Sequence, residues 1–219
     1  MSIRKEAEEN LRVIRSLMEK ATIYRAISAP TALVGGLFSA GLGIWMYMHA
    51  KANPDGGCAR CFITGWLSVL AVTAAANGFF IWRAARERNE PFISAAMRKA
   101  LWALLPSMLG GGFFTFWLTA MAGESAAWLL PEFWMVFYGL ALLATSQFSP
   151  RSITILGWCF LLTGFASFGI DSSIGSIDLL RNMESNRAAM ANLFMVATFG
   201  GFHLIYAACT WARKADSEA

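Results

Sequence analysis

His203 is the residue whose type and position could most directly carry chemistry, because it lies near the middle of the apolar stretch 189–211. An ionisable side chain at that depth of a membrane span is costly and by default marks a functional candidate, such as a haem or metal ligand or a proton relay. His49 lies at the outer end of another stretch, so the two histidines cannot form an internal two-histidine haem site. The competing interpretation is a neutral imidazole bonded to Asn77, Tyr206 or a backbone carbonyl, because polar side chains commonly join helices. We favour this packing role and keep His203 as the one candidate cofactor-binding residue.

Cys58 and Cys61 form a CxxC motif in the loop after the first apolar stretch. The spacing fits half of a zinc site, but no second CxxC or paired histidine follows it, so we expect no metal site. A redox dithiol would need a thioredoxin-like context, and a c-type haem site would need a histidine where Phe62 stands. Because an outer loop in a bacterium faces an oxidising compartment, we expect a disulfide or a pair of inert thiols, and we predict the disulfide.

Carboxylates at the ends of the apolar stretches are the third candidate. Glu132 and Asp171 lie where two predicted spans enter the membrane, and paired carboxylates could gather a cation or act as acid and base. Their separation along the chain gives no geometry, so we interpret them as solvated loop charges. The sequence contains no nucleophile elbow, Walker loop, dinucleotide fingerprint or HExxH motif. We therefore assign no catalytic residue and no cofactor, and we expect no enzymatic activity.

The composition indicates the elements that must position these residues. Of 219 residues, 57% are hydrophobic and only 15% are charged, against about 25% charged in an ordinary soluble domain. A membrane-spanning helix needs about 20 mostly apolar residues. The sequence therefore predicts an all-α polytopic membrane protein, with a bundle of six transmembrane helices grouped as three hairpins by short loops. The predicted spans are 27–48, 62–82, 100–120, 126–146, 152–170 and 189–211.

The distribution of Lys and Arg predicts the orientation of these spans. Fourteen of the 18 basic residues fall on one side, which the positive-inside rule assigns to the cytoplasm. Residues 1–26 are then a cytoplasmic amphipathic helix, 27–212 the six-helix domain, and 213–219 a cytoplasmic tail, so both termini are cytoplasmic. We expect the lipid bilayer as partner, and no nucleic acid, because the cations flank spans.

Small residues four apart predict where spans touch. Gly35, Ser39 and Gly43 share one face of the first span, and Ser107, Gly111 and Thr115 share one face of the third. Such faces let helix backbones approach closely. Six tryptophans near the predicted span ends indicate an interfacial belt: Trp45, Trp66, Trp82, Trp128, Trp134 and Trp211.

The segment before the first span carries a resemblance. Residues 18–28 read Met-Glu-Lys-Ala-Thr-Ile-Tyr-Arg-Ala-Ile-Ser, and a glycine-rich span follows. This resembles the N-terminal signature of a family of uncharacterised bacterial inner-membrane proteins, in which Arg stands in place of Lys20 and a Ser or Thr follows it directly. The resemblance implies a multi-pass protein of the bacterial inner membrane and assigns no site.

Three functional hypotheses follow. The first is a non-enzymatic accessory or scaffolding subunit that binds other membrane proteins or its own copies. The second is a small transporter with a polar site at Asn77 and His203, favoured by an internal echo in which Pro30 and Pro106 each precede a Gly-Gly pair. The third is a haem- or metal-binding membrane protein.

Overall fold

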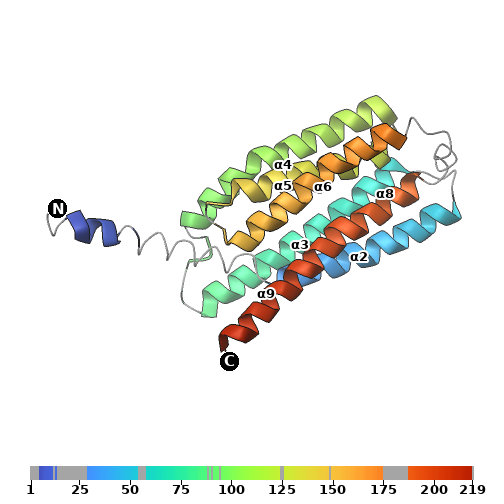
Figure 1. Cartoon of the computed structure of the whole chain (residues 1–219). Coiled ribbons are helices and arrows are strands. Elements are labelled where there is room, and N and C mark those ends of the chain that lie inside the picture. The colour runs from blue at the N-terminus through green and yellow to red at the C-terminus, as the bar shows by residue number, and fades with distance from the viewer. Residues whose placement is uncertain are drawn as a thin grey trace.

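The structure is a computed structural model of the chain. It describes residues 5–11, 13, 29–53, 58–87, 89, 91–93, 95–123, 126–147, 149–174 and 187–218. All regular secondary structure in this part of the chain is helical (Figure 1). The elements are α2 (Ala29–Ala52), α3 (Ala59–Glu87), α4 (Ala95–Ala122), α5 (Ala126–Ala144), α6 (Arg151–Ile174), α8 (Arg187–Met195), the π-helical segment η3 (Val196–Phe202) and α9 (His203–Glu218).

Five of the helical stretches are long and apolar enough to cross a bilayer: Ala29–Ala52, Ala59–Glu87, Met97–Ala122, Arg151–Gly169 and Ala189–Ala212. The helix α5 also contains an apolar stretch, Trp128–Ala144, but this stretch is shorter. A backbone inside lipid must satisfy its own hydrogen bonds, which helices do within one segment. The chain is therefore a helical, multi-pass integral membrane protein.

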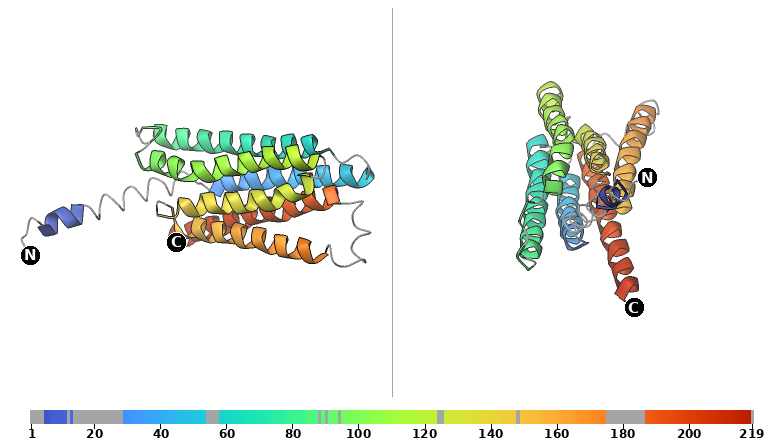
Figure 2. Two further views of the ribbon diagram at one scale, coloured as in Figure 1. Left: turned by 90° about the horizontal axis from the view of Figure 1, so that it is seen from above. Right: turned by 90° about the vertical axis from the view of Figure 1, so that its left-hand side faces the viewer.

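The helices form two groups that pack side by side. One group holds α4, α5 and α6 in chain order, and the other holds α2, α3 and the last segment α8–η3–α9 (Figure 1). Contacts from α5 to α8 and α3 join the groups. Figure 2 shows α3 and α6 on opposite sides of the assembly, with α2, α5 and α9 between them.

The last span packs differently from the predicted third hairpin. It lies along α2 through α8, η3 and α9, whereas it touches α6 only slightly. The first and last spans are thus neighbours, and α2 begins at the end of the bundle where α9 ends (Figure 1). The link between α6 and α8 is long enough to free the last span from α6, so the loop length does not dictate the pairing.

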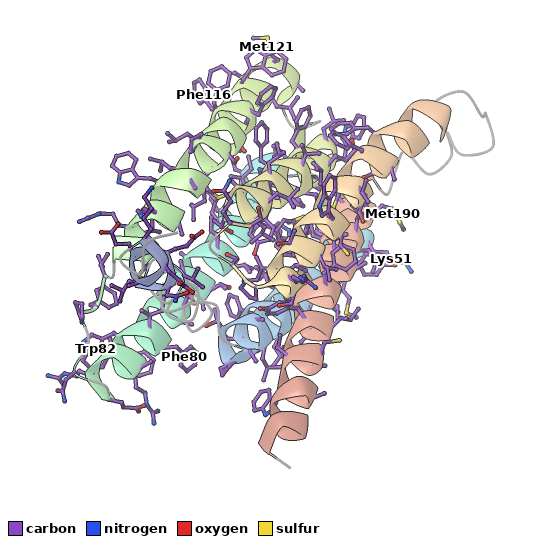
Figure 3. The ribbon with its side chains drawn as sticks, turned by 60° about the vertical axis from the view of Figure 1, so that its left-hand side comes forward. Lys51, Phe80, Trp82, Phe116, Met121 and Met190 are labelled. Atoms are coloured by element: carbon purple, nitrogen blue, oxygen red, sulfur yellow. A yellow bond between two sulfur atoms is a disulfide. The ribbon has the colours of Figure 1, made fainter. Side chains whose placement is uncertain are left out.

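Two apolar clusters fill the interior. One gathers Phe62, Trp66, Leu130 and Met195, and the other gathers Met135, Ile153, Phe160 and Tyr206. The half-buried ring of Phe199 packs against both, so the clusters are continuous. The outer faces carry large apolar side chains, among them Phe116 and Met121 on α4 (Figure 3). Apolar groups inside and outside are what a helix bundle in lipid requires.

Some of the predicted segments lie only partly within the described residues. In the predicted N-terminal helix, residues 5–11 are helical and exposed. Residues 18–28, which carry the resemblance, lie outside the described residues. A short amphipathic helix that the sequence indicates over 176–185 also lies outside it. At the other end, α9 continues as a helix to Glu218, through the predicted tail.

Candidate functional site

His203 bridges α9 to α5 through its imidazole ring. Its Nδ1 lies 2.8 Å from the carbonyl oxygen of Phe199, one turn earlier in the same segment. Its Nε2 lies 2.9 Å from the hydroxyl oxygen of Tyr138 on α5. The backbone carbonyl was among the expected partners. Tyr138 was not, although a tyrosine in mid-span was the sequence signal that could have found it.

These two contacts determine the tautomer of the ring. A carbonyl oxygen can only accept a hydrogen bond, so Nδ1 of His203 carries the proton and donates to Phe199. In the neutral ring Nε2 is then an acceptor, and the hydroxyl of Tyr138 donates to it. Both ring nitrogens are engaged, and a metal or haem iron could bind Nε2 only by displacing Tyr138.

Aromatic rings surround this polar pair. The ring of Phe160 packs edge-on against Tyr138, with centroids 4.8 Å apart, and tilts against Phe199 at the same separation. Phe160 also lies 5.6 Å from the ring of His203. Phe160 is fully buried. The hydrogen-bonded pair is half-buried and lies against an apolar cluster, where losing either partner would leave a partly buried polar group unsatisfied.

The backbone before His203 is a π-helix, η3, within an otherwise α-helical span. The backbone N–H of His203 bonds to the carbonyl of Gly200, while the side chain takes the carbonyl of Phe199. Gly200 and Gly201 lie in this segment, and a Cβ added at Gly200 would make an ordinary van der Waals contact with Ala40 of α2. Segments of this kind occur frequently at functional sites. The segment places His203 on the side of the span that faces α5.

Asn77, the other member of the predicted polar site, belongs to a different contact. The hydroxyl of Thr31 on α2 donates to Oδ1 of Asn77 on α3 at 3.2 Å. His203 is instead bonded to Tyr138 and Phe199. The structure therefore uses the two residues in separate hydrogen bonds between or within helices.

Two further side-chain hydrogen bonds connect helices. The indole Nε1 of Trp66 donates to Oδ1 of Asn192 at 3.1 Å and ties α3 to α8. The indole Nε1 of Trp134 donates to the hydroxyl of Thr115 at 2.8 Å and ties α5 to α4. Trp66 is only 4% exposed, so its assignment to an interfacial belt is wrong. The position of Trp66 near a span end does not reveal that α8 covers it.

Glu132 is also placed differently from the sequence expectation. We interpreted it as a solvated loop charge, but the residue is 6% exposed and lies inside α5. The helix begins at Ala126, so Glu132 is about 9 Å along its axis. A Cβ added at Gly164 of α6 would lie 3.3 Å from the backbone oxygen of Glu132. Close packing of α5 on α6 explains the burial.

The predicted small-residue faces lie at helix contacts. Gly35, Ser39 and Gly43 are buried on α2, where an added Cβ would meet Thr73 at Gly35 and both Val196 and Trp66 at Gly43. On α4, Gly111 is buried and an added Cβ would lie 3.3 Å from Cβ of Phe137. On the same face Ser107 is half-buried, and Thr115 accepts the bond from Trp134.

Cys58 and Cys61 are joined by a disulfide, with Cα atoms 5.1 Å apart, at the start of α3. The sulfur of Cys58 also accepts the backbone N–H of Cys61 at 3.1 Å, as the side chain of an N-cap residue does. Cys159 and Cys209 are free and exposed on α6 and α9. Within the described residues, no group of three or more His, Cys, Asp or Glu side chains could hold a metal ion.

Fold and site together define a multi-pass helical membrane protein whose intramembrane polar side chains pair between helices. In comparisons with known proteins, no family model, curated protein or solved structure matches this chain.

Proposed function

We propose that the chain is a non-enzymatic accessory or scaffolding subunit that associates with other membrane proteins or with its own copies. The observation that supports this is the use of its intramembrane polar groups. These groups form hydrogen bonds between helices: Thr31–Asn77, Trp66–Asn192, Trp134–Thr115 and Tyr138–His203. Polar side chains that bond to one another between helices stabilise the bundle. The outer faces of the helices are then the surfaces that can bind partners.

The helix α4 offers an apolar outer face for such association. It packs on α5, and its other side exposes Leu109, Phe113, Phe116 and Met121. Crosslinking in native membranes followed by purification tests the proposal. We expect a defined partner or a discrete homo-oligomer to be captured, and a monomer free of crosslinked protein would contradict it.

We further propose six spans, with both termini on the cytoplasmic side of a bacterial inner membrane. The placement of α5 beside the candidate spans α4 and α6 supports a sixth crossing. An even number of crossings agrees with α2 beginning where α9 ends. A reporter fused after Ala219 should be active only in the cytoplasm, and export of that reporter would overturn the topology.

A small transporter is the second candidate, because the π-helical segment η3 directly precedes His203. In that case the Tyr138–His203 pair would carry protons. Proteoliposomes containing a pH-sensitive dye would report this activity. Proton flux that the wild-type protein supports and a folded His203→Gln variant does not would favour transport over the accessory role.

A further inference from the structure

The adjoining ends of α3 and α4 repeat one arrangement of side chains. On α3, Trp82 is followed one turn outward by Arg86. On α4, Trp102 is preceded one turn outward by Lys99 and Arg98. The two tryptophans are 43% and 68% exposed, and the three cations are exposed as well. Each helix end therefore presents an indole ring with positive charge beyond it.

Helix length places these groups at the membrane surface. The helix α3 has 29 residues and α4 has 28, so each is over 40 Å long at about 1.5 Å per residue. The hydrocarbon core is about 30 Å thick. From Ala122, the end of α4, Trp102 is about 30 Å away, and Lys99 and Arg98 lie roughly one turn further. The indole therefore lies near the hydrocarbon boundary and the cations lie among the headgroups.

The charge at this surface is unbalanced. Arg83 forms an ion pair with Glu87, with Nε and Oε1 2.9 Å apart. Arg86 instead lies with its guanidinium 5.0 Å from the centroid of the Trp82 ring. Neither Arg98 nor Lys99 forms an ion pair with an acidic side chain in the described part of the chain.

The link between the helices adds apolar contact. Phe92 and Ile93 are both exposed there, between the end of α3 and the start of α4. Exposed apolar side chains beside unbalanced positive charge match the chemistry of a bilayer surface, with acyl chains below and phosphate above. Figure 3 shows Trp82 at the edge of the molecule, directed away from the bundle.

We propose that the ends of α3 and α4 joined by the 88–94 link, which carry Trp82, Arg86, Arg98, Lys99 and Trp102, bind the headgroups of anionic phospholipids. Guanidinium and ammonium groups donate charge-assisted hydrogen bonds to the phosphate oxygens. The indole rings lie at the boundary between acyl chains and headgroups and anchor the helix ends at that depth. The proposal depends neither on the accessory role nor on which side of the membrane this end faces.

Native mass spectrometry of the detergent-solubilised full chain tests the proposal, with phosphatidylglycerol and phosphatidylcholine titrated separately. We expect the first phosphatidylglycerol to bind at least fivefold more tightly, because each cation near a headgroup contributes about that factor. R98Q/K99Q should raise the Kd for phosphatidylglycerol at least fivefold and leave the Kd for phosphatidylcholine unchanged.

The matched control removes the same number of exposed cations from the other end of the bundle. Lys51 and Arg60 are exposed near the ends of α2 and α3 that meet there, and K51Q/R60Q should leave both dissociation constants unchanged. Equal Kd values for both lipids in the wild-type protein would overturn the proposal. An equal loss in the control would do the same, because net charge alone would then explain binding.

Competition with inorganic phosphate tests whether the cations bind a lipid headgroup or a soluble anion. At constant ionic strength it should not displace phosphatidylglycerol, and full displacement would reassign the surface to free phosphate and overturn the lipid proposal. Circular dichroism and gel filtration establish that the variants are folded. If the double variant does not fold, the single variants R98Q and K99Q carry the test, with K51Q as their control.

Discussion

The hydroxyl of Tyr138 donates a hydrogen bond of 2.9 Å to Nε2 of His203. Tyr138 belongs to the α4–α5–α6 group and His203 to the group that holds α2, α3 and the last span. The hydrogen bonds Thr31–Asn77, Trp66–Asn192 and Trp134–Thr115 each stay within one group. The Tyr138–His203 pair instead joins the two halves of the bundle.

Tyr138→Phe should lower the thermal stability of the protein in detergent. The variant keeps the ring but leaves Nε2 of His203 without its donor, in a half-buried site. Hydrogen bonds between membrane helices contribute about 0.6 kcal/mol on average and up to about 2 kcal/mol, so we expect Tm to fall by a few degrees. In a double-mutant cycle with His203→Gln, a coupling energy near zero would show that the two side chains do not act together.

Gly111→Leu should weaken the packing of α4 on α5. A Cβ at this position already lies 3.3 Å from Cβ of Phe137, so a leucine side chain would push the helices apart. Gly112→Leu is the matched control, because an added Cβ there meets nothing within 4 Å. We expect a lower Tm for the first variant and an unchanged Tm for the second. Equal effects of the two substitutions would contradict this assignment of faces.

Alkylation should distinguish two classes of cysteine. Of the four cysteines, Cys159 and Cys209 are free, and Cys58 and Cys61 are bonded to each other. Denatured protein isolated without reductant should therefore take up two alkyl groups by mass, and reduced protein should take up four. Uptake of four groups without reductant would mean that the disulfide does not form in the cell or during isolation.

Asn192→Leu should destabilise the contact between α3 and α8. The substitution preserves approximate side-chain volume but leaves the buried indole N–H of Trp66 without its acceptor, at a cost of about 1–3 kcal/mol. Trp66→Phe should also lower Tm, whereas Trp102→Phe should not, because Trp102 is exposed. The unfolding midpoints of these three variants provide the measurement. An unchanged midpoint for both Asn192→Leu and Trp66→Phe would contradict a stabilising hydrogen bond between Trp66 and Asn192.

Much of the fold follows from the sequence, because bilayer thickness imposes a local requirement. Each predicted span lies within or almost within one helical stretch, and the helices extend beyond most of the span ends by a few residues. Small residues at intervals of four also marked contact faces, as Gly35 and Gly111 show, since helical periodicity places such residues on one side. Both patterns can be recognised within a single segment.

The tertiary structure decided which segments meet and how each helix is rotated about its axis. Nothing local to α9 indicates that His203 would pair with Tyr138, or that Asn77 would pair with Thr31. Nor does hydropathy reveal that Trp66 bonds to Asn192 of α8, or that Glu132 is buried inside α5. Apolar residues face both lipid and the bundle interior, so hydropathy does not distinguish the two sides of a span. Only close packing between helices distant in sequence selects the face that is buried and the polar partners that lie on it.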